Sequence, residues 1–180
     1  MKTIVLTALS TFILFFSIAY TGCKPDKCKN VTCAYSGTCK DGSCICQTGY
    51  EGTHCETIMR EKFKGIWNVN EDGSLTGAAQ YTMSIEEGDV INEVKIRNFQ
   101  NHFQEPVIGV VHNDSIVIPI QSFSNGYTVD GVGYIVGTNP LNQHYYQHAV
   151  VYVYYKVVNN IGVVNEYGTG GSNGPSLWSK

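Results

Sequence analysis

Seven cysteines stand in the first third of the 180-residue chain, and none follows Cys55. Six of them, beginning with Cys28, are separated by four, five, four, one and eight residues. So short a segment cannot bury enough apolar surface to fold alone, and oxidised cysteines must supply much of its stability. Spacing alone leaves the pairing open. The cysteines therefore predict a small disulfide-bonded module in an exported protein.

A zinc site is the alternative for these sulfurs, because Cys44, Cys46 and His54 are all metal-ligand types. Zinc sites usually separate paired cysteines by about two to four residues, whereas a single residue lies between Cys44 and Cys46. Export also favours oxidation over metal binding. We expect no metal site and no cofactor.

The run CICQTGYEGTHC, residues 44–55, resembles the closing half of an EGF-like module. The resemblance implies the disulfides Cys28–Cys39, Cys33–Cys44 and Cys46–Cys55. Calcium-binding EGF-like modules carry an Asn or Asp followed by an aromatic residue between the third and fourth cysteines, and the loop 40–43 is too short for that pattern. We therefore expect an EGF-like module over residues 23–57 that binds no calcium.

A basic residue, Lys2, precedes an uncharged and mostly apolar stretch over residues 3–20. This order, followed by small residues, is typical of a secretory signal. An uncleaved membrane-spanning anchor is the alternative, because eighteen uncharged residues are nearly long enough to cross a bilayer.

The segment Tyr20-Thr21-Gly22-Cys23 resembles a bacterial lipobox, in which a small residue precedes the cysteine that becomes the lipidated first residue of the mature protein. A lipidated Cys23 cannot form a disulfide, which accounts for the odd number of cysteines. The resemblance implies a signal peptide over residues 1–22 and a lipid anchor in a bacterial outer membrane, with the cell surface as a candidate location. Several acyl chains anchor firmly, because each buried CH2 contributes about 0.8 kcal/mol.

Residues 58–180 show the period of two that is typical of strands with one buried face. Apolar and polar residues alternate over residues 79–86. In the next stretch Val90, Val94 and Ile96 are expected on one apolar face.

Turn residues divide the rest of this region into further short strands. Hairpin turns are predicted at Asn113-Asp114 and at Asn159-Asn160, and Pro119 indicates an edge strand or a bulge. About eight short strands and no long amphipathic helix predict an antiparallel β-barrel or sandwich, and thus a mostly β protein.

The motif Gly65-x-Trp67, on the first expected strand, resembles the Gly-x-Trp motif of lipocalins, in which the Trp plugs one end of an eight-stranded barrel. The resemblance implies a carrier of a small apolar ligand, with Trp67 as a candidate contact. The second lipocalin motif and the closing Arg are not recognisable. An ordinary core aromatic is the alternative for Trp67.

The order of lipobox, EGF-like module, polar link and β-domain resembles a class of exported lipoproteins from Bacteroidota-type bacteria. The run CETIMREKFKGIWNV, residues 55–69, carries most of this likeness. The resemblance implies location and fold, and no activity. Our leading hypothesis is a lipid-anchored envelope protein in which the EGF-like module is a spacer or protein-contact module presenting the β-domain.

No motif indicates catalysis, since a Gly-x-Ser-x-Gly elbow, an H-E-x-x-H pair and a phosphate-binding glycine loop are all absent from the sequence. His144 and His148 lie on an expected extended segment, where four residues separate them by roughly 13 Å, too far to share one metal ion. We expect a protein that is not an enzyme and has no catalytic residues.

Alternation over residues 151–156 places Tyr152 and Tyr154 on one face and Val151 and Val153 on the other. Two outward tyrosines would form a platform for a glycan or a protein partner, which is the basis of a candidate adhesin function. Cross-strand aromatic packing is the alternative. The net charge of −3 and the lack of a basic run argue against a nucleic-acid partner.

Overall fold

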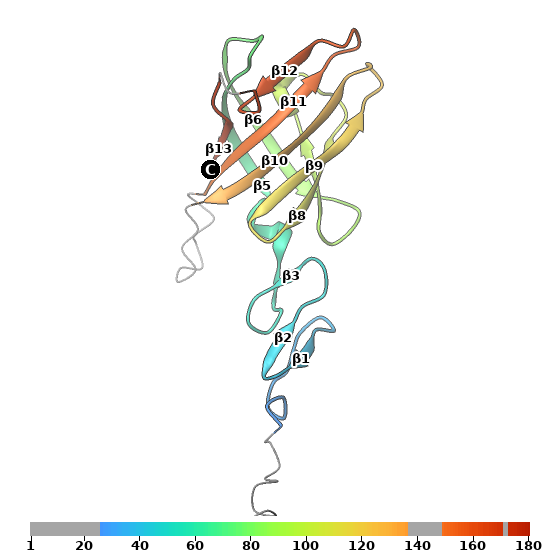
Figure 1. Ribbon diagram of the computed structural model, residues 1–180, viewed down its shortest axis with the longest axis vertical. Helices are drawn as coiled ribbons and strands as arrows, with labels where there is room; N and C mark the ends of the chain where they lie inside the picture. The colour runs from blue at the N-terminus through green and yellow to red at the C-terminus, as the bar shows by residue number, and fades with distance from the viewer. Residues whose placement is uncertain (1–25, 137–148, 171–172) are drawn as a thin grey trace, which may run out of the picture.

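The computed structural model describes residues 26–136, 149–170 and 173–180, and it shows the EGF-like module extending from one end of a β-barrel (Figure 1). The predicted signal peptide, Cys23, His144 and His148 lie outside the described residues. Within the described residues, no helix has the length and apolar character needed to cross a membrane.

The chain is mostly β, and the two 3-10 helices among the described residues, η1 and η2, are single turns. The elements in chain order are β1 (Thr38–Lys40), β2 (Ser43–Ile45), β3 (Tyr50–Glu51), β4 (Thr57–Ile58), η1 (Met59–Lys62), β5 (Gly65–Asp72), β6 (Ala78–Glu87), β7 (Glu93–Arg97), η2 (Phe99–Asn101), β8 (Val107–His112), β9 (Ser115–Ser122), β10 (Thr128–Val136), β11 (Val150–Val158), β12 (Val164–Tyr167) and β13 (Ser176–Ser179).

Three disulfides hold the module together, and they are the pairs that the EGF-like resemblance implies. They join Cys28 to Cys39, Cys33 to Cys44, and Cys46 to Cys55. β1 pairs with β2, and β3 pairs with β4, as two small antiparallel sheets. Between residues 26 and 57, Cys55 is the one hydrophobic residue that is fully buried. Cross-links, and not an apolar core, therefore stabilise this part of the chain.

Eight strands close the barrel in the order β5-β6-β7-β8-β9-β10-β11-β13, and β13 returns to β5. All of these neighbours are antiparallel. β12 pairs with the part of β11 that lies beyond β13, so the two short strands share one edge of β11. The prediction of about eight strands is confirmed, and closure makes the domain a barrel and not a sandwich.

Alternating residues fill the barrel interior, as the period of two predicts. On β11, Val151, Val153 and Tyr155 are buried, whereas Tyr152 and Tyr154 face outward. Aromatic rings pack edge to face in the core. The centroid of the Phe99 ring lies 4.9 Å from that of Tyr155 and 6.3 Å from that of Trp178. Pro119 sits at a bulge of β9 against β10, which confirms one of the two alternatives for that residue.

The structure differs from the sequence predictions at two connections. Val90 is exposed, because β7 begins only at Glu93, so Val94 and Ile96 face the core without it. Asn159-Asn160 is not a two-residue turn, because the connection from β11 to β12 includes five residues, 159–163. The Asn159 side chain holds this longer loop by accepting hydrogen bonds of 3.1 and 2.9 Å from the backbone N–H groups of Ile161 and Val163.

Trp67 closes the barrel end that adjoins the module. Its indole is fully buried, and Nε1 donates a 2.6 Å hydrogen bond to the carbonyl oxygen of Phe63. The Nζ atom of Lys180 lies 4.6 Å from the centre of the Trp67 ring and donates a 2.6 Å hydrogen bond to the carbonyl oxygen of Lys64. Trp67 is therefore a core aromatic, which is the alternative to the lipocalin interpretation, and Lys180 is the cation over its ring.

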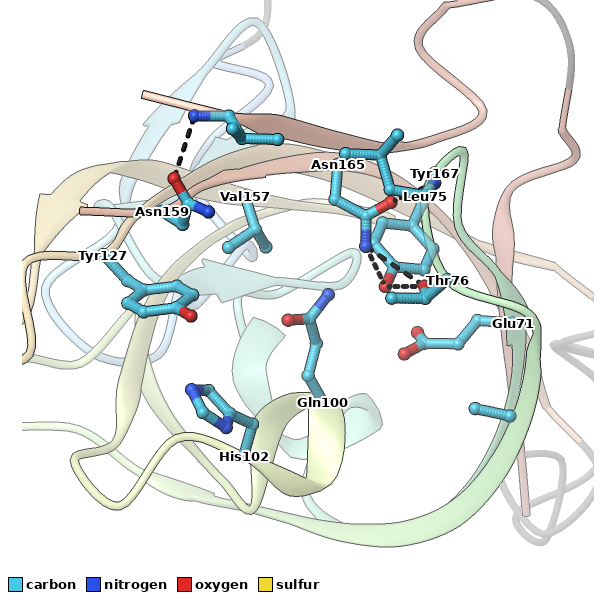
Figure 2. A pocket seen from close by; sticks show the side chains of 12 residues that line it. Glu71, Leu75, Thr76, Gln100, His102, Tyr127, Val157, Asn159, Asn165 and Tyr167 are labelled. Carbon is cyan, nitrogen blue, oxygen red and sulfur yellow. Dashed lines mark hydrogen bonds between the residues drawn. The ribbon is translucent and has the colours of Figure 1, made fainter. Parts of the chain in front are cut away.

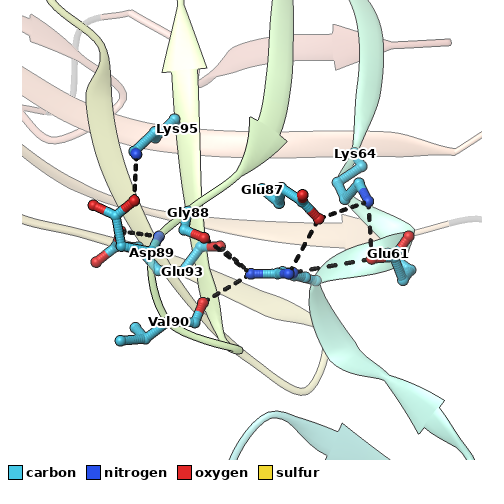
Figure 3. Close-up of polar contacts among 9 residues, drawn as sticks. Glu61, Lys64, Glu87, Gly88, Asp89, Val90, Glu93 and Lys95 are labelled. Atoms are coloured by element: carbon cyan, nitrogen blue, oxygen red, sulfur yellow. Dashed lines mark hydrogen bonds and ion pairs between the residues drawn. The ribbon is translucent and has the colours of Figure 1, made fainter.

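η1 joins the module to the barrel through two basic side chains. Lys62 is only 4% exposed, and its Nζ lies 2.9 Å from the carboxylate of Glu51 on β3 and 2.7 Å from that of Asp114 between β8 and β9. The guanidinium of Arg60 donates hydrogen bonds of 3.3 and 2.8 Å to the carbonyl oxygens of Gly88 and Val90, which are labelled on the β6–β7 connection in Figure 3.

Backbone contacts reinforce this junction. The N–H of Met59 donates a 2.9 Å hydrogen bond to the carbonyl oxygen of Gly49 in the module. A Cβ at Gly49 would meet Cγ2 of Ile91, on the β6–β7 connection, at 2.5 Å, and Gly49 also has a positive φ of 90°. Only glycine fits that close approach without strain. The module is thus fixed to the barrel by charge, hydrogen bonds and packing together.

Candidate ligand-binding pocket

A cavity of about 400 Å³ lies at the barrel end opposite the module. Strand directions place it there: β5 starts beside the module and ends at Glu71 and Asp72, and the cavity is lined by Glu71, the β5–β6 loop, η2 and the β11–β12 loop. The same loops lie at the far end of the barrel from β1–β3 in Figure 1. The pocket volume falls in the lower part of the range for small-molecule sites, about 300–1,000 Å³.

Polar and apolar side chains share the lining (Figure 2). The charged or hydrogen-bonding ones are Glu71, Thr76, Gln100, His102, Asn159 and Asn165. The aliphatic and aromatic ones are Leu75, Ala79, Tyr127, Val157, Val163 and Tyr167. Such a mixture suits a ligand with an apolar body and a few polar groups.

Glu71 is the acidic residue of this lining, and its side chain points into the cavity in Figure 2. It is 7% exposed. Its Oε1 accepts a 3.0 Å hydrogen bond from the Tyr81 hydroxyl, and its Oε2 accepts bonds of 2.8 Å from Tyr155 and 2.7 Å from Ser176. All three donors are neutral hydroxyl groups.

Burial raises the pKa of Glu71 above its ordinary value of 4.5, and the hydrogen bonds from Ser176, Tyr155 and Tyr81 only partly oppose that rise. The pKa of Tyr81 is raised in turn, first by burial and then by the nearby charge of Glu71. The same two causes hold the pKa of Tyr155 well above its ordinary value. The tyrosines therefore stay protonated and act as donors to the carboxylate.

A second set of hydrogen bonds positions the Glu71 network. Gln100 contributes twice: its backbone N–H donates 3.0 Å to the Tyr81 hydroxyl, and its side-chain amide donates 3.1 Å to the Tyr155 hydroxyl. The indole N–H of Trp178 donates 3.0 Å to the Ser176 hydroxyl. Each hydroxyl that donates to Glu71 thus also accepts a hydrogen bond from another group. These second bonds fix the donors and hence the orientation of the carboxylate.

The rim of the pocket is tied by Asn165 on β12. Its Oδ1 accepts a 3.0 Å hydrogen bond from the N–H of Leu75, and its Nδ2 donates 3.1 Å to Thr76 and 2.9 Å to the Tyr167 hydroxyl. The ring of Tyr167 stacks on that of Tyr155 with centroids 4.2 Å apart. The β5–β6 loop and β12 therefore form one wall, although they are far apart in the sequence.

The candidate residues from the sequence do not line this pocket. Trp67 is packed at the opposite end of the barrel, and Tyr152 and Tyr154 face outward from β11. Cys23 lies outside the described residues. Among the residues that the structure describes, no group of three or more His, Cys, Asp or Glu side chains lies close enough to hold a metal ion.

Sequence reasoning missed Glu71, although a signal for it exists. Trp67, Val69 and Glu71 alternate along β5 and share the inward face, as their burial shows. A carboxylate on the core face of a strand is costly unless it is paired or functional. An acidic residue at a position where the alternation predicts a buried side chain is therefore a sequence signal that Glu71 has a special role. Its partners Tyr155 and Ser176 carry no such local signal.

Comparison with known proteins gives a match for the disulfide-bonded module. Residues 28–57 match the family described as the Teneurin-like EGF domain. The match covers the three disulfides and ends before η1, so it concerns the module and not the barrel. The chain therefore consists of an EGF-like module that presents an eight-stranded β-barrel.

Proposed function

We propose that this protein is a non-enzymatic lipoprotein of a bacterial outer membrane, anchored through Cys23, whose barrel holds a small ligand on the side away from the membrane. The EGF-like module is the spacer between the anchor and the barrel. The position of the pocket carries the binding part of the proposal, because its lining residues lie at the barrel end opposite the module, and Cys23 precedes the module in the sequence.

The rigid junction supports the spacer role. A flexible linker would let the barrel tumble against the membrane, whereas Lys62 and Arg60 fix the module to the barrel through the contacts of η1. The polar surface of the module also suits a spacer, since few of its side chains are buried. The proposal therefore gives the module a mechanical task and the barrel the binding task.

Metabolic labelling with an alkyne analogue of palmitate tests the anchor in a host that processes bacterial lipoproteins. We expect the wild-type protein to take up label and the Cys23→Ser variant to take up none. The matched control is Tyr20→Leu, which restores the usual aliphatic residue of a lipobox and should keep the label. An unlabelled wild-type protein, or a labelled Cys23→Ser variant, would refute the anchor.

A thermal-shift screen with a chemically diverse small-molecule library tests the binding task. We expect some compounds to raise the unfolding temperature of the wild-type protein, and Ala79→Trp to abolish that rise by filling the pocket. Leu177→Trp, on the outer face of β13, is the matched control and should retain it. A library without any stabilising compound would count against the pocket as a binding site.

A row of exposed side chains on the outer wall favours a second candidate, a contact surface for a protein or glycan. Tyr134, Tyr152 and Leu177 stand opposite one another on β10, β11 and β13, and are 49%, 39% and 38% exposed. Tyr154 is half-buried. A glycan array tests this role: a blank array, or binding unchanged by Tyr152→Ala, removes it.

A further inference from the structure

We propose that the pocket binds a small amphipathic amine, with the ligand's ammonium group paired to the carboxylate of Glu71 and its apolar body against the aliphatic and aromatic wall. This inference rests on the proposed function, because it names the ligand class of the pocket that we assign as the binding site.

The charge balance of the pocket is the first argument. Of the residues that line it, Glu71 is the one acid and His102 the one basic side chain. None of the ion pairs formed by the described residues includes Glu71. A buried carboxylate without a counter-ion is costly, and proteins retain such groups chiefly where a partner or a function compensates them. A cationic ligand supplies the missing charge.

The geometry of the hydrogen bonds is the second argument. The Oε2 of Glu71 accepts two hydrogen bonds, whereas Oε1 accepts one, from Tyr81, among the described residues. A carboxylate oxygen has two acceptor positions, so Oε1 keeps one for a further donor. Glu71 lines the cavity and its side chain points into it in Figure 2, so we place the ligand's donor at this position of Oε1. An ammonium group there would form a charge-assisted hydrogen bond, which is stronger than a neutral one.

A metal ion is a poorer match than an ammonium group. Hard cations such as calcium take about six to eight oxygen ligands, several of them carboxylates. The described residues supply no cluster of three metal-ligating side chains, and the hydroxyl groups next to Glu71 already direct their protons at it. An ammonium ion needs a single carboxylate and a few neutral acceptors. The carboxylate of Glu71 and the side-chain oxygen of Gln100, both in the lining, provide that set, whereas the side-chain oxygens of Asn159 and Asn165 already accept backbone N–H groups.

The apolar lining residues indicate what the uncharged part of the ligand is. Val157, Val163, Leu75 and Tyr167 line the same cavity as Glu71. The ring of Tyr155, whose hydroxyl donates to the carboxylate, stacks on the ring of Tyr167. Aromatic faces attract cations as well as apolar groups. A cavity of about 400 Å³ suits one ring on a short chain and not a long acyl chain. The ligand class is therefore an arylalkyl or alkyl amine.

Isothermal titration calorimetry of the intact protein with three matched probes tests this inference. The probes are 3-phenylpropylamine, 3-phenylpropan-1-ol and 3-phenylpropionate, which share one body and differ in charge. We expect the amine to bind at least about tenfold more tightly than the alcohol, since a charge-assisted hydrogen bond is worth about a factor of ten or more. The carboxylate probe should show no binding.

Glu71→Gln should reduce the affinity for the amine by about tenfold or more and leave the weak affinity for the alcohol unchanged. His102→Gln, at the rim of the same pocket, is the matched control and should keep the preference for the amine. Equal binding of amine and alcohol to the wild-type protein, or an amine affinity unaffected by Glu71→Gln, would overturn the inference.

Proton release gives a test that leaves Glu71 itself unchanged. Below the raised pKa of Glu71, amine binding should expel the carboxyl proton, so the heat of binding should depend on the ionisation enthalpy of the buffer. The other titratable groups around Glu71 are Tyr81 on β6, Tyr155 on β11, Tyr167 on β12 and His102 beyond η2. The three tyrosines have raised pKa values and stay neutral, and His102→Gln separates the contribution of the histidine.

The failure of this inference and that of the proposed function have different signatures. If neutral or anionic compounds stabilise the protein and Ala79→Trp abolishes their effect, the pocket is a binding site and only the amine class is wrong. If neither the library nor the three probes bind, the amine class and the binding task of the barrel both fall, and the lipid anchor still depends on the labelling experiment. Amine binding without proton release below the pKa of Glu71 would also contradict the proposed pairing.

Discussion

The Tyr155 hydroxyl donates a 2.8 Å hydrogen bond to Oε2 of Glu71, although 84 residues separate the two along the chain. β13 lies between β5 and β11, and its backbone pairing with β5 ends at Asn70. Beyond Asn70, the hydrogen bond between the side chains of Tyr155 and Glu71 joins β11 to β5. The buried carboxylate therefore completes the wall of the barrel and also forms part of the pocket. Its ionisation should influence stability as well as binding.

The variant Glu71→Gln should change how stability depends on pH. Because burial raises the pKa of Glu71 above 4.5, the folded state binds the carboxyl proton more tightly than the unfolded chain. The wild-type free energy of unfolding should thus fall as pH rises from about 4.5 through the raised folded pKa. Calorimetry over this interval should show that the Tm of Glu71→Gln increases relative to the Tm of the wild type as the pH rises.

Glu105→Gln is the control for this pH dependence. Hydrogen bonds from the side chain and backbone of Ser124 lower the pKa of Glu105, so its contribution has the opposite sign. That contribution is present above the ordinary value of 4.5 and is lost as pH falls. Parallel Tm curves for Glu71→Gln and the wild type would contradict the prediction.

Reduction of the disulfides should unfold the module and spare the barrel. All cysteines of the chain precede residue 56, whereas both tryptophans, Trp67 and Trp178, lie in the barrel core. We expect reductant to leave the near-ultraviolet circular dichroism of the tryptophans in place while protease cleavage within residues 28–57 accelerates. The double variant Cys46→Ser, Cys55→Ser should give the same pattern. Simultaneous loss of the tryptophan signal would show that the barrel depends on the module.

The variant Lys62→Met should loosen the junction. It removes the cation between Glu51 and Asp114 and leaves two carboxylates facing each other, which we expect to cost about 1–2 kcal/mol, between surface and buried ion pairs. NMR relaxation should then report independent tumbling of the module. Lys156→Met, which breaks the Lys156–Asp130 contact within the barrel wall, is the control and should leave the tumbling uniform. Uniform tumbling of Lys62→Met would disprove the role of this side chain.

The variant Trp67→Ala should destabilise the barrel strongly. The side chain is fully buried, and removal of a buried aromatic typically costs about 3–5 kcal/mol. Leu177→Ala, on the exposed face of β13, should change stability by about 0.5 kcal/mol or less. Denaturant unfolding measures both. Similar losses for the two variants would contradict the assignment of Trp67 to the barrel core.

Local sequence information determined the module and the faces of the strands. The run at residues 44–55 resembles an EGF-like module, and that resemblance implied the observed disulfides, which the cysteine spacing alone had left open. Alternation correctly separated Val151 and Val153 from Tyr152 and Tyr154, because side chains of a strand point to opposite faces in turn.

Tertiary structure alone decided how the barrel closes and what its open end contains. The closing strand Ser176–Ser179 has four residues, too few to show a period, and its place is set by pairing with β5 and β11. The partners of Glu71 come from three strands, with Ser176 lying 105 residues away in the chain. Strand order and register bring such groups together, and no local pattern encodes either. The sequence therefore determined which side chains point inward, and the closed sheet decided which of them meet.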